Sequence, residues 1–325
     1  MPVGGSAGPV RNVTAQDYPV GQGRSLPRVR PGPQGTSGEQ GSLERLGALM
    51  MRHAQQAPAG FVGAVVLILL MLTALLAPVL APHDPLAIDL QGRLDSPGWE
   101  HPLGTDHLGR DVLSRLLVGS RASLGAAGFT VVVVTTIGVA LGTLAGFQGG
   151  WVDEIVMRLV DTVLAFPSII LALVVAGLLG PGLRNVILGL TLVRWAGCAR
   201  LVRGLVLSVR EREFVMAAHS IGAGKARIVT RHVLPGILGP VVVMATLDLG
   251  SVLLSMSGLS YIGLGVQLPH PEWGAMVNEA QLHVQTAPWL AVAPGMAIVI
   301  TVLSANLLGD TLRDLLDPRY RRILS

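Results

Sequence analysis

Long runs with few or no charged side chains dominate the chain between residues 57 and 308. About 20 mainly apolar residues suffice for a helix to cross the hydrocarbon core of a bilayer. Each run should be helical, because lipid offers no hydrogen-bond partner to a free backbone group. The predicted spans are residues 57–82, 122–152, 162–183, 186–206, 236–266 and 287–308. The pattern therefore predicts an all-α membrane protein with six transmembrane helices.

Three residues interrupt the predicted spans. Pro167 should kink the third span, because proline removes one backbone hydrogen bond. Arg194 lies within the fourth, where we expect it to snorkel or to line a cavity. Asp248 lies near the middle of the fifth, and a carboxylate at that depth is a functional candidate by default. It could lower the barrier for a divalent cation in a pore, or it could hydrogen-bond to Thr246, Ser251 or a partner helix.

The composition supports a polytopic membrane protein. Hydrophobic residues make up 50% of the 325 residues, charged residues only 14%, and the mean hydropathy is +0.58. Soluble domains carry about 25% charged residues. The single cysteine, Cys198, excludes an intrachain disulfide and a cysteine metal cluster. The formal net charge of +4 bears on membrane topology more than on nucleic acid, for which we predict no binding.

The basic residues predict how the chain is oriented. With the N-terminus inside, six lie before the first span, one in the 148–159 loop, seven around residues 200–235 and four at the C-terminal end, against five outside. Positive residues favour the cytoplasmic side of a membrane. We therefore predict that both termini are cytoplasmic.

The ends of the chain differ from its middle. Residues 1–41 hold nine glycines and six prolines, a share above the roughly 25–30% typical of low-complexity disorder. We predict a disordered cytosolic tail there, followed by a short amphipathic helix over 43–53. The predicted organisation is then an N-terminal region, 42–121, with the first span and an outer loop, a transmembrane core, 122–309, that contains the cytosolic stretch 210–235, and a cytosolic C-terminal tail, 310–325.

One cytosolic stretch, residues 210–235, should form a helical hairpin. Good helix formers fill residues 211–221, and Gly222 and Gly224 interrupt them, because glycine loses the most freedom when fixed in a helix. A second helix should run to Val233 and end at Leu234-Pro235, because proline cannot continue the hydrogen-bond ladder. Such a hairpin predicts a docking surface rather than a substrate pocket.

This hairpin contains an incomplete match to a phosphate-binding motif. Gly224-Lys225 superficially matches a phosphate loop. That loop needs a glycine five residues before the Gly-Lys pair and Ser or Thr after it. His219 and Ala226 occupy those positions. The chain therefore binds no ATP by this motif, and energy must come from another polypeptide.

The hairpin also resembles the EAA loop of ABC-importer permeases, through Ala217-Ala218, Gly222 and Leu234-Pro235. In that family the loop is a coupling helix seated in a groove of the ATPase subunit. Met216 stands where the family has a glutamate, and Glu213 lies one turn earlier. The resemblance implies ATPase-coupling roles for Glu213, Met216, Ala217, Ala218, Gly222, Leu234 and Pro235.

A second motif lies in the predicted outer loop. Its residues are Gly104, Thr105, Asp106, Gly109, Arg110 and Asp111. Two carboxylates flank the arginine, and the glycines permit tight turns. We expect a compact ion-paired turn that leads into an interfacial helix over 110–120, or a brace at the outer mouth. The stretch resembles the signature of the permease branch that handles dipeptides, oligopeptides and nickel.

Further motifs extend the resemblance to about residues 58–319. Residues 259–265, Trp273-Gly274, Gly309-Asp310 and 317–319 are similar to the same branch. Within it, the likeness is strongest to the C-type subunit of nickel permeases, through residues 87–90, 105–108, 245–248 and 269–274. Asp248 in particular resembles the nickel type.

The resemblance implies a type I ABC-importer permease in the cell membrane. It implies a homologous second permease subunit, two cytosolic ATPases, an extracytoplasmic binding protein near loops 83–121 and 267–286, and no cofactor. The cargo would be nickel or a nickel chelate, with dipeptides or oligopeptides as the alternative. The chain itself would not be an enzyme.

Other candidates remain open at this point. The outer-side histidines His83, His101, His107, His270 and His283 could ligate a transition metal, but none forms a two-histidine motif on a helix face. The small-residue series Gly138, Gly142 and Gly146 could serve packing within the subunit or between subunits. Asp161 could pair with Arg158 one turn away.

Two other classes of protein fit less well. A secondary transporter would need a pair of broken half-helices at the membrane midplane, which the sequence does not indicate. An intramembrane hydrolase would need a nucleophile facing a base, and Ser255 or Ser257 with a distant histidine makes a poor pair.

Overall fold

The computed structural model describes residues 58–316, which all belong to one compact unit. The predicted tail over 1–41, the amphipathic helix over 43–53 and the motif at 317–319 lie outside the described residues.

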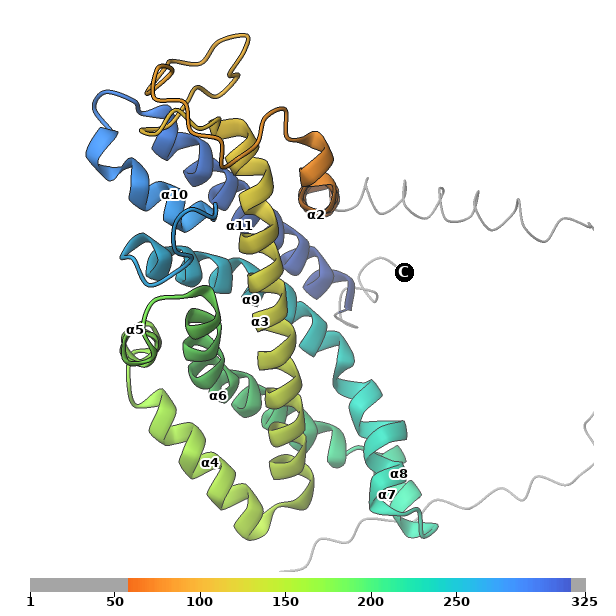
Figure 1. The fold of residues 1–325 in the computed structure, drawn as a ribbon. Helices are drawn as coiled ribbons and strands as arrows, with labels where there is room; N and C mark the ends of the chain where they lie inside the picture. Colours follow the sequence, from red (N-terminus) through yellow and green to blue (C-terminus); the bar gives the residue numbers. More distant parts are fainter. Residues whose placement is uncertain (1–57, 317–325) are drawn as a thin grey trace, which may run out of the picture. The chain divides into compact units, whose positions relative to one another are not determined.

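The described part of the chain contains helices and no strand, which confirms the all-α prediction (Figure 1). Five helical segments are long and apolar enough to cross a membrane, and a bent pair of helices supplies a sixth if it counts as one span. The five are α2 (Pro58–Leu80), α3 (Val112–Gln148), α6 (Leu183–Arg210), the run Lys225–Tyr261 and α11 (Trp289–Leu316). Shorter helices are α7 (Glu213–Ser220), α10 (Trp273–Ala280) and the 3-10 turn η2 (Gln281–His283).

The third predicted span is broken rather than kinked. α4 (Gly150–Leu164) and α5 (Ser168–Leu179) meet at an angle of 87°. Pro167 stands immediately before α5, with ψ 122°. The break arises because proline has no N–H to give to the helix and disfavours helical geometry in the residue before it. Among residues 58–316 only this one span is broken, whereas secondary transporters of the inverted-repeat type have broken helices at corresponding positions of two repeats.

The predicted interfacial helix over 110–120 does not exist as a separate element. α3 starts at Val112 and continues unbroken to Gln148, so it crosses the position where we expected the transmembrane core to begin. Asp111 caps its first turn, with the side chain accepting a hydrogen bond from the Ser114 backbone N–H at 2.8 Å. A good cap starts a helix, and no proline follows to stop it.

Pro235 does not end the second arm of the hairpin, contrary to prediction. α8 (Lys225–Ile228) passes through a π-helical turn, Val229–Val233, directly into α9 (Leu234–Tyr261). Pro235 lies in the first turn of α9. The preceding π-helical turn already interrupts the regular i→i−4 hydrogen bonds, so the helix tolerates the missing proline N–H there. The hairpin arm and the membrane helix are therefore one continuous rod.

The glycine series in α3 packs within this subunit. A Cβ at Gly142 would lie 2.5 Å from the Ala199 carbonyl oxygen of α6, and one at Gly146 would lie 3.0 Å from the Arg203 carbonyl oxygen. Gly138 likewise meets Cys198. Of the two alternatives, the structure supports close packing of α3 on α6.

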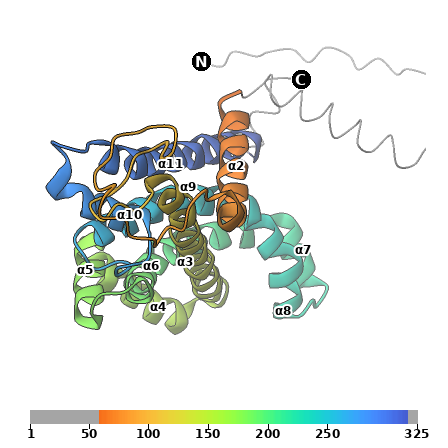
Figure 2. The same ribbon diagram turned by 45° about the horizontal axis from the view of Figure 1, so that its top comes forward.

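The largest hydrophobic core joins α3, α5, α6, α9, α10 and α11, and it includes Leu190, Leu253, Met256 and Trp273. A second cluster joins α6 to α7, α8 and α9. Figure 2 shows α7 and α8 standing at one side of the bundle. We call this side the hairpin end. The 81–111 loop and α10 lie together at the opposite end, which we call the loop end (Figure 1).

Candidate functional site

The hairpin has the predicted shape of a helix, a glycine break and a second helix. Gly222 adopts φ +79°, a conformation that favours glycine, and a Cβ there would meet no other atom. The Ala223 N–H donates to the Ala218 carbonyl at 3.1 Å, which closes the end of α7 in the manner of a C-terminal glycine cap. Gly222 is therefore required by the backbone turn rather than by crowding.

One face of the hairpin is fixed to the bundle. Val215 and Ala218 of α7 are buried in the same hydrophobic cluster as Ile228, Val206 and Val233. Ala218, one of the predicted coupling residues, thus packs inward. A push on α7 must therefore displace α6 and α9, because these side chains share one close-packed cluster.

The other face is free within the described residues. Of the predicted coupling residues, Glu213, Met216, Ala217, Gly222 and Pro235 are exposed and Leu234 is half-buried. Sequence reasoning missed Phe214 and Ile221, whose side chains add to the exposed apolar surface, Ile221 being 85% exposed. Exposed basic residues surround this surface, namely Arg210, Arg212, Lys225, Arg227 and Arg231. A cleft of about 730 Å³ separates the hairpin from the end of α3. Exposed apolar side chains with a charged rim are typical of docking sites.

A buried ionic network occupies the loop end. The Arg110 guanidinium donates through Nε to Asp106 at 2.6 Å and through Nη2 to Glu279 at 2.6 Å. Arg115 donates to the other Glu279 oxygen at 2.8 Å and lies 3.4 Å from Asp106. The two arginine side chains are only 1–2% exposed. Two positive and two negative groups thus balance in a site closed to water.

This network corrects part of the predicted turn. Asp106 pairs with Arg110 as expected, whereas Asp111 caps α3 and faces two histidines instead. Glu279 comes from α10, and no sequence pattern could connect it to an arginine 169 positions away. Gly104 and Gly109 adopt φ +72° and +75°, which confirms that the turns need glycine.

Loops 83–121 and 267–286, which we expected to share the outer face, do lie against each other. The Arg115 guanidinium donates to Glu279 at 2.8 Å, and the Trp273 indole N–H donates to the Leu116 carbonyl at 3.0 Å. Trp273 is buried in the main core. α10 is thereby fixed to the first turns of α3.

The predicted outer histidines fall into two groups. His83 and His101 converge on Asp111. His107 and His283 stack with ring centroids 5.7 Å apart, and burial lowers the pKa of His107. His270 belongs to neither group.

Asp248 forms an ion pair that the sequence did not reveal. The Arg194 guanidinium of α6 donates to Asp248 of α9 and, at 2.8 Å, to the Ser251 hydroxyl. The alternative partner Thr246 instead donates to the Val242 carbonyl. Asp248 lines a cavity of about 630 Å³, together with Leu201, Met244 and Arg313. Arg194 and Asp248, which interrupt two different predicted spans, thus form one site.

Two further ion pairs fasten α4 to α6. Asp161 pairs with Arg200, not with Arg158 as predicted. Asp153 accepts two hydrogen bonds from Arg203, at 2.5 and 2.6 Å. The broken span is therefore held to α6 by partners on a different helix.

Helices able to span a membrane, an exposed helical hairpin at one end and a buried ionic network at the other define a polytopic membrane protein. The family of the binding-protein-dependent transport system inner membrane component matches residues 138–322, and the N-terminal transmembrane domain of oligopeptide transport permease C matches residues 46–97. The chain therefore belongs to the permease subunits of binding-protein-dependent ABC importers, in the peptide/nickel branch. Membership implies ATPase and substrate-binding partners in general.

Three relatives illustrate the breadth of the branch. The nickel transport system permease protein NikC of Escherichia coli K12 is 46% identical over 254 residues, covering 78% of this chain and 92% of that protein. The dipeptide transport system permease protein DppC of Alkalihalophilus pseudofirmus is 40% identical over 260 residues, covering 80% and 86%. The glutathione transport system permease protein GsiD of Escherichia coli O6:K15:H31 is 43% identical over 259 residues, covering 79% and 86%. All are transporter permeases of the membrane rather than enzymes, as predicted for this chain.

Proposed function

We propose that this chain pairs with a homologous permease subunit to import nickel in chelated form, and that two cytosolic ATPases drive transport by moving the α7–α8 hairpin. The observation that carries the mechanism is the unbroken helical run Lys225–Tyr261. It begins in the hairpin and contains Asp248, so the docking surface and the intramembrane charge lie on one rod.

The drive would act through contact, not through chemistry in this chain. The exposed Phe214, Met216 and Ile221 give an ATPase a surface to grip, while Val215 and Ala218 hold the hairpin to the bundle. A ligand shifts a conformational equilibrium only by its differential affinity for the two states. The ATPases must therefore bind the hairpin differently before and after ATP hydrolysis.

The charges at Asp248 bear on the form of the cargo. A guanidinium stays protonated at any physiological pH, so the Arg194–Asp248 pair is neutral overall and would not attract a bare divalent cation as a lone carboxylate would. The Arg194 Nε is buried and has no hydrogen-bond partner among residues 58–316. The guanidinium thus has a spare donor, which a cargo carboxylate reaches only when helix movement uncovers it. A nickel chelate with carboxylate ligands suits this pair better than aqueous nickel.

The same pair favours a second candidate cargo. A dipeptide carries a carboxylate and an ammonium group, which complement Arg194 and Asp248 respectively. The names of the relatives include both nickel and dipeptide permeases. The resemblance of residues 245–248 to nickel permeases supports nickel as the cargo. The paired charges of Arg194 and Asp248 support a dipeptide.

The experiment reconstitutes the complete complex in proteoliposomes and follows three labelled cargoes: aqueous nickel, nickel with a polycarboxylate chelator, and a dipeptide. We expect ATP-dependent uptake of the chelate to exceed that of aqueous nickel and of the dipeptide. Preferred uptake of the dipeptide would assign the chain to peptide transport. Preferred uptake of aqueous nickel would contradict the role given to Arg194.

Variants separate the pathway from assembly. Asp248→Asn should reduce uptake more than it reduces complex assembly, because the hairpin and the α3–α6 packing are untouched. Combining it with Arg194→Gln removes both charges and should restore any lost assembly without restoring uptake. Thr246→Val, on the same helix, is the control and should transport normally. Equal loss of uptake and assembly in Asp248→Asn would assign the pair a purely structural role.

A further inference from the structure

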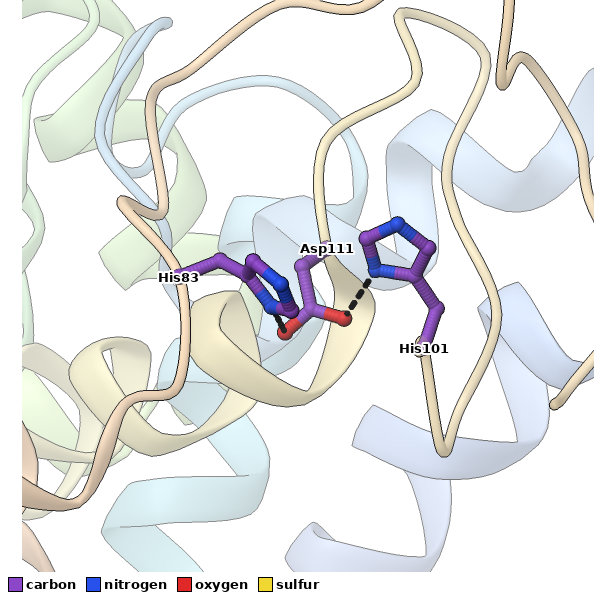
Figure 3. A group of neighbouring side chains, drawn as sticks. All are labelled: His83, His101 and Asp111. Carbon is purple, nitrogen blue, oxygen red and sulfur yellow. Dashed lines mark hydrogen bonds and ion pairs between the residues drawn. The ribbon is translucent and has the colours of Figure 1, made fainter. Parts of the chain in front are cut away.

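We infer that His83, His101 and Asp111 bind a divalent transition-metal ion at the loop end. Figure 3 shows His83 and His101, from separate parts of the 81–111 loop, both facing the carboxylate of Asp111, which precedes α3. The two imidazole rings lie beside each other, with centroids 4.8 Å apart. The site is distinct from the Arg194–Asp248 pair and does not depend on the proposed cargo.

The spacing of the ligand atoms suits a shared ion. The His101 Nδ1 lies 3.0 Å from one Asp111 oxygen, and the His83 Nδ1 lies 3.8 Å from the other. Nitrogen and oxygen ligands bind zinc-like ions at about 2.0–2.2 Å, which puts neighbouring ligand atoms roughly 3.0–3.5 Å apart. The His101–Asp111 distance already meets this spacing. The His83–Asp111 distance would meet it after a movement of well under an ångström by the exposed His83 ring.

A hydrogen bond accounts for only half of the arrangement. The His101 ring can donate to Asp111 at 3.0 Å. The His83 contact of 3.8 Å is too long for a hydrogen bond. The Asp111 oxygen that faces His83, Oδ2, also already accepts hydrogen bonds from the Ser114 N–H and hydroxyl, at 2.8 and 2.6 Å. An ion between the rings and the carboxylate explains why both imidazoles face it.

The surroundings hold the ligands in place before an ion arrives. Ser114 links two of them, because its hydroxyl donates to Asp111 and accepts from the His83 backbone N–H at 3.0 Å. The Asp111 side chain is 1% exposed, whereas the His83 and His101 side chains are 39% and 26% exposed. The carboxylate is thus fixed by hydrogen bonds, as is usual for metal ligands, and the histidine side remains open to solvent.

The ligand types indicate which ions fit. Imidazole suits nickel, cobalt, zinc and copper, whereas magnesium and calcium prefer oxygen ligands. Three protein ligands leave coordination positions open, unlike a closed structural zinc site. The site should therefore hold an exchangeable ion that can take a further ligand from solution.

A neighbouring cluster provides an internal contrast. Asp106, His107 and Glu279 also bring possible ligand atoms together. Both carboxylates of that cluster are already engaged by Arg110 and Arg115. The arginines would repel an incoming cation, so this second cluster should bind no metal. Both clusters bring ligand atoms close together. They differ in local charge, because arginines pair with the carboxylates of the second cluster only.

The test measures binding of Co²⁺ and of Ni²⁺ to the assembled complex in lipid nanodiscs, without the binding protein. Visible absorption of bound Co²⁺ reports its ligands, and equilibrium dialysis of labelled Ni²⁺ gives the affinity. We expect His83→Ala and His101→Ala each to weaken binding by about tenfold or more, a loss that removal of even an outer-shell partner can cause. His270→Ala and His107→Ala are the controls and should bind as the unchanged protein does.

Two results would overturn the site: Co²⁺ binding that survives in the His83→Ala/His101→Ala double variant, or no saturable binding to the unchanged complex. Asp111→Ala is not used, because it removes the α3 cap and so disturbs folding. Since the readout is binding and not uptake, a failure of the proposed nickel cargo would leave this test intact.

Discussion

Glu279 is the residue on which the loop end depends most strongly. Its carboxylate accepts hydrogen bonds from Arg110 at 2.6 Å and from Arg115 at 2.8 and 3.1 Å. Replacing it by glutamine keeps the shape and removes the charge. The network then holds two buried guanidinium groups against the single carboxylate of Asp106.

The expected cost follows from burial. Removing one partner of a buried ion pair costs about 3–5 kcal/mol, because the remaining charge stays uncompensated in a medium of low polarity. An exposed pair is worth about 0–1 kcal/mol. Asp161 and Arg200, with side chains 64% and 50% exposed, form such a pair and give a matched control. Glu279→Gln should therefore destabilise the protein several times more than Asp161→Asn.

The assay is thermal unfolding of the purified complex in nanodiscs, with both variants measured side by side. At roughly 2–4 °C per kcal/mol for a domain of this size, Glu279→Gln should lower the unfolding temperature by ~10 °C. Asp161→Asn should lower it by no more than about 4 °C. Equal shifts for the two variants would refute the view that burial of the charges holds α10 to α3.

Two further predictions test packing and pH. Gly142→Ala should destabilise by about 1–3 kcal/mol through overpacking, because its Cβ would lie 2.5 Å from the Ala199 carbonyl, whereas Gly125→Ala on the same helix, with open space around it, should not. Measured unfolding temperatures that rank these two the other way would contradict the α3–α6 packing. Burial lowers the pKa of His107 below 6.5 in the folded protein, so its stabilising contribution is present above about pH 6.5 and is lost as the pH falls through the folded-state pKa. His107→Gln should therefore reduce the drop in unfolding temperature between about pH 7.5 and 5, and an unchanged drop would count against this assignment.

The spans could be predicted because they depend on composition over many residues. A stretch such as 57–82 needs only enough apolar length, whatever it packs against. The break at Gly222 could also be predicted, because the backbone there needs φ +79°, a property of one residue. The orientation of the chain in the membrane stays a prediction.

The errors arose where one residue type serves two purposes. Pro235 was expected to end a helix, yet proline is also favoured in the first turn, which is where it lies in α9. Asp111 was read as a partner for Arg110, yet an aspartate before a helix is equally a cap, and it caps α3. In both cases the choice depended on the helix that follows, which the local pattern left open.

The long-range pairs could not be predicted at all. Arg194 and Asp248 are 54 positions apart, on α6 and α9, and Glu279 is 169 positions from Arg110. Helical periodicity relates residues three or four positions apart. Each charge could be flagged as costly in its place, but its partner depends on how the helices pack.

The most direct test of the transport mechanism breaks the rod between the hairpin and α9. Two glycines inserted between Val233 and Leu234 should uncouple the reconstituted complex, so that ATP hydrolysis continues while cargo uptake stops. The same insertion between Gly149 and Gly150, already a turn, is the control and should leave uptake largely intact. Normal ATP-driven uptake in the Val233–Leu234 insertion, or uptake by a complex without ATPases, would contradict the mechanism.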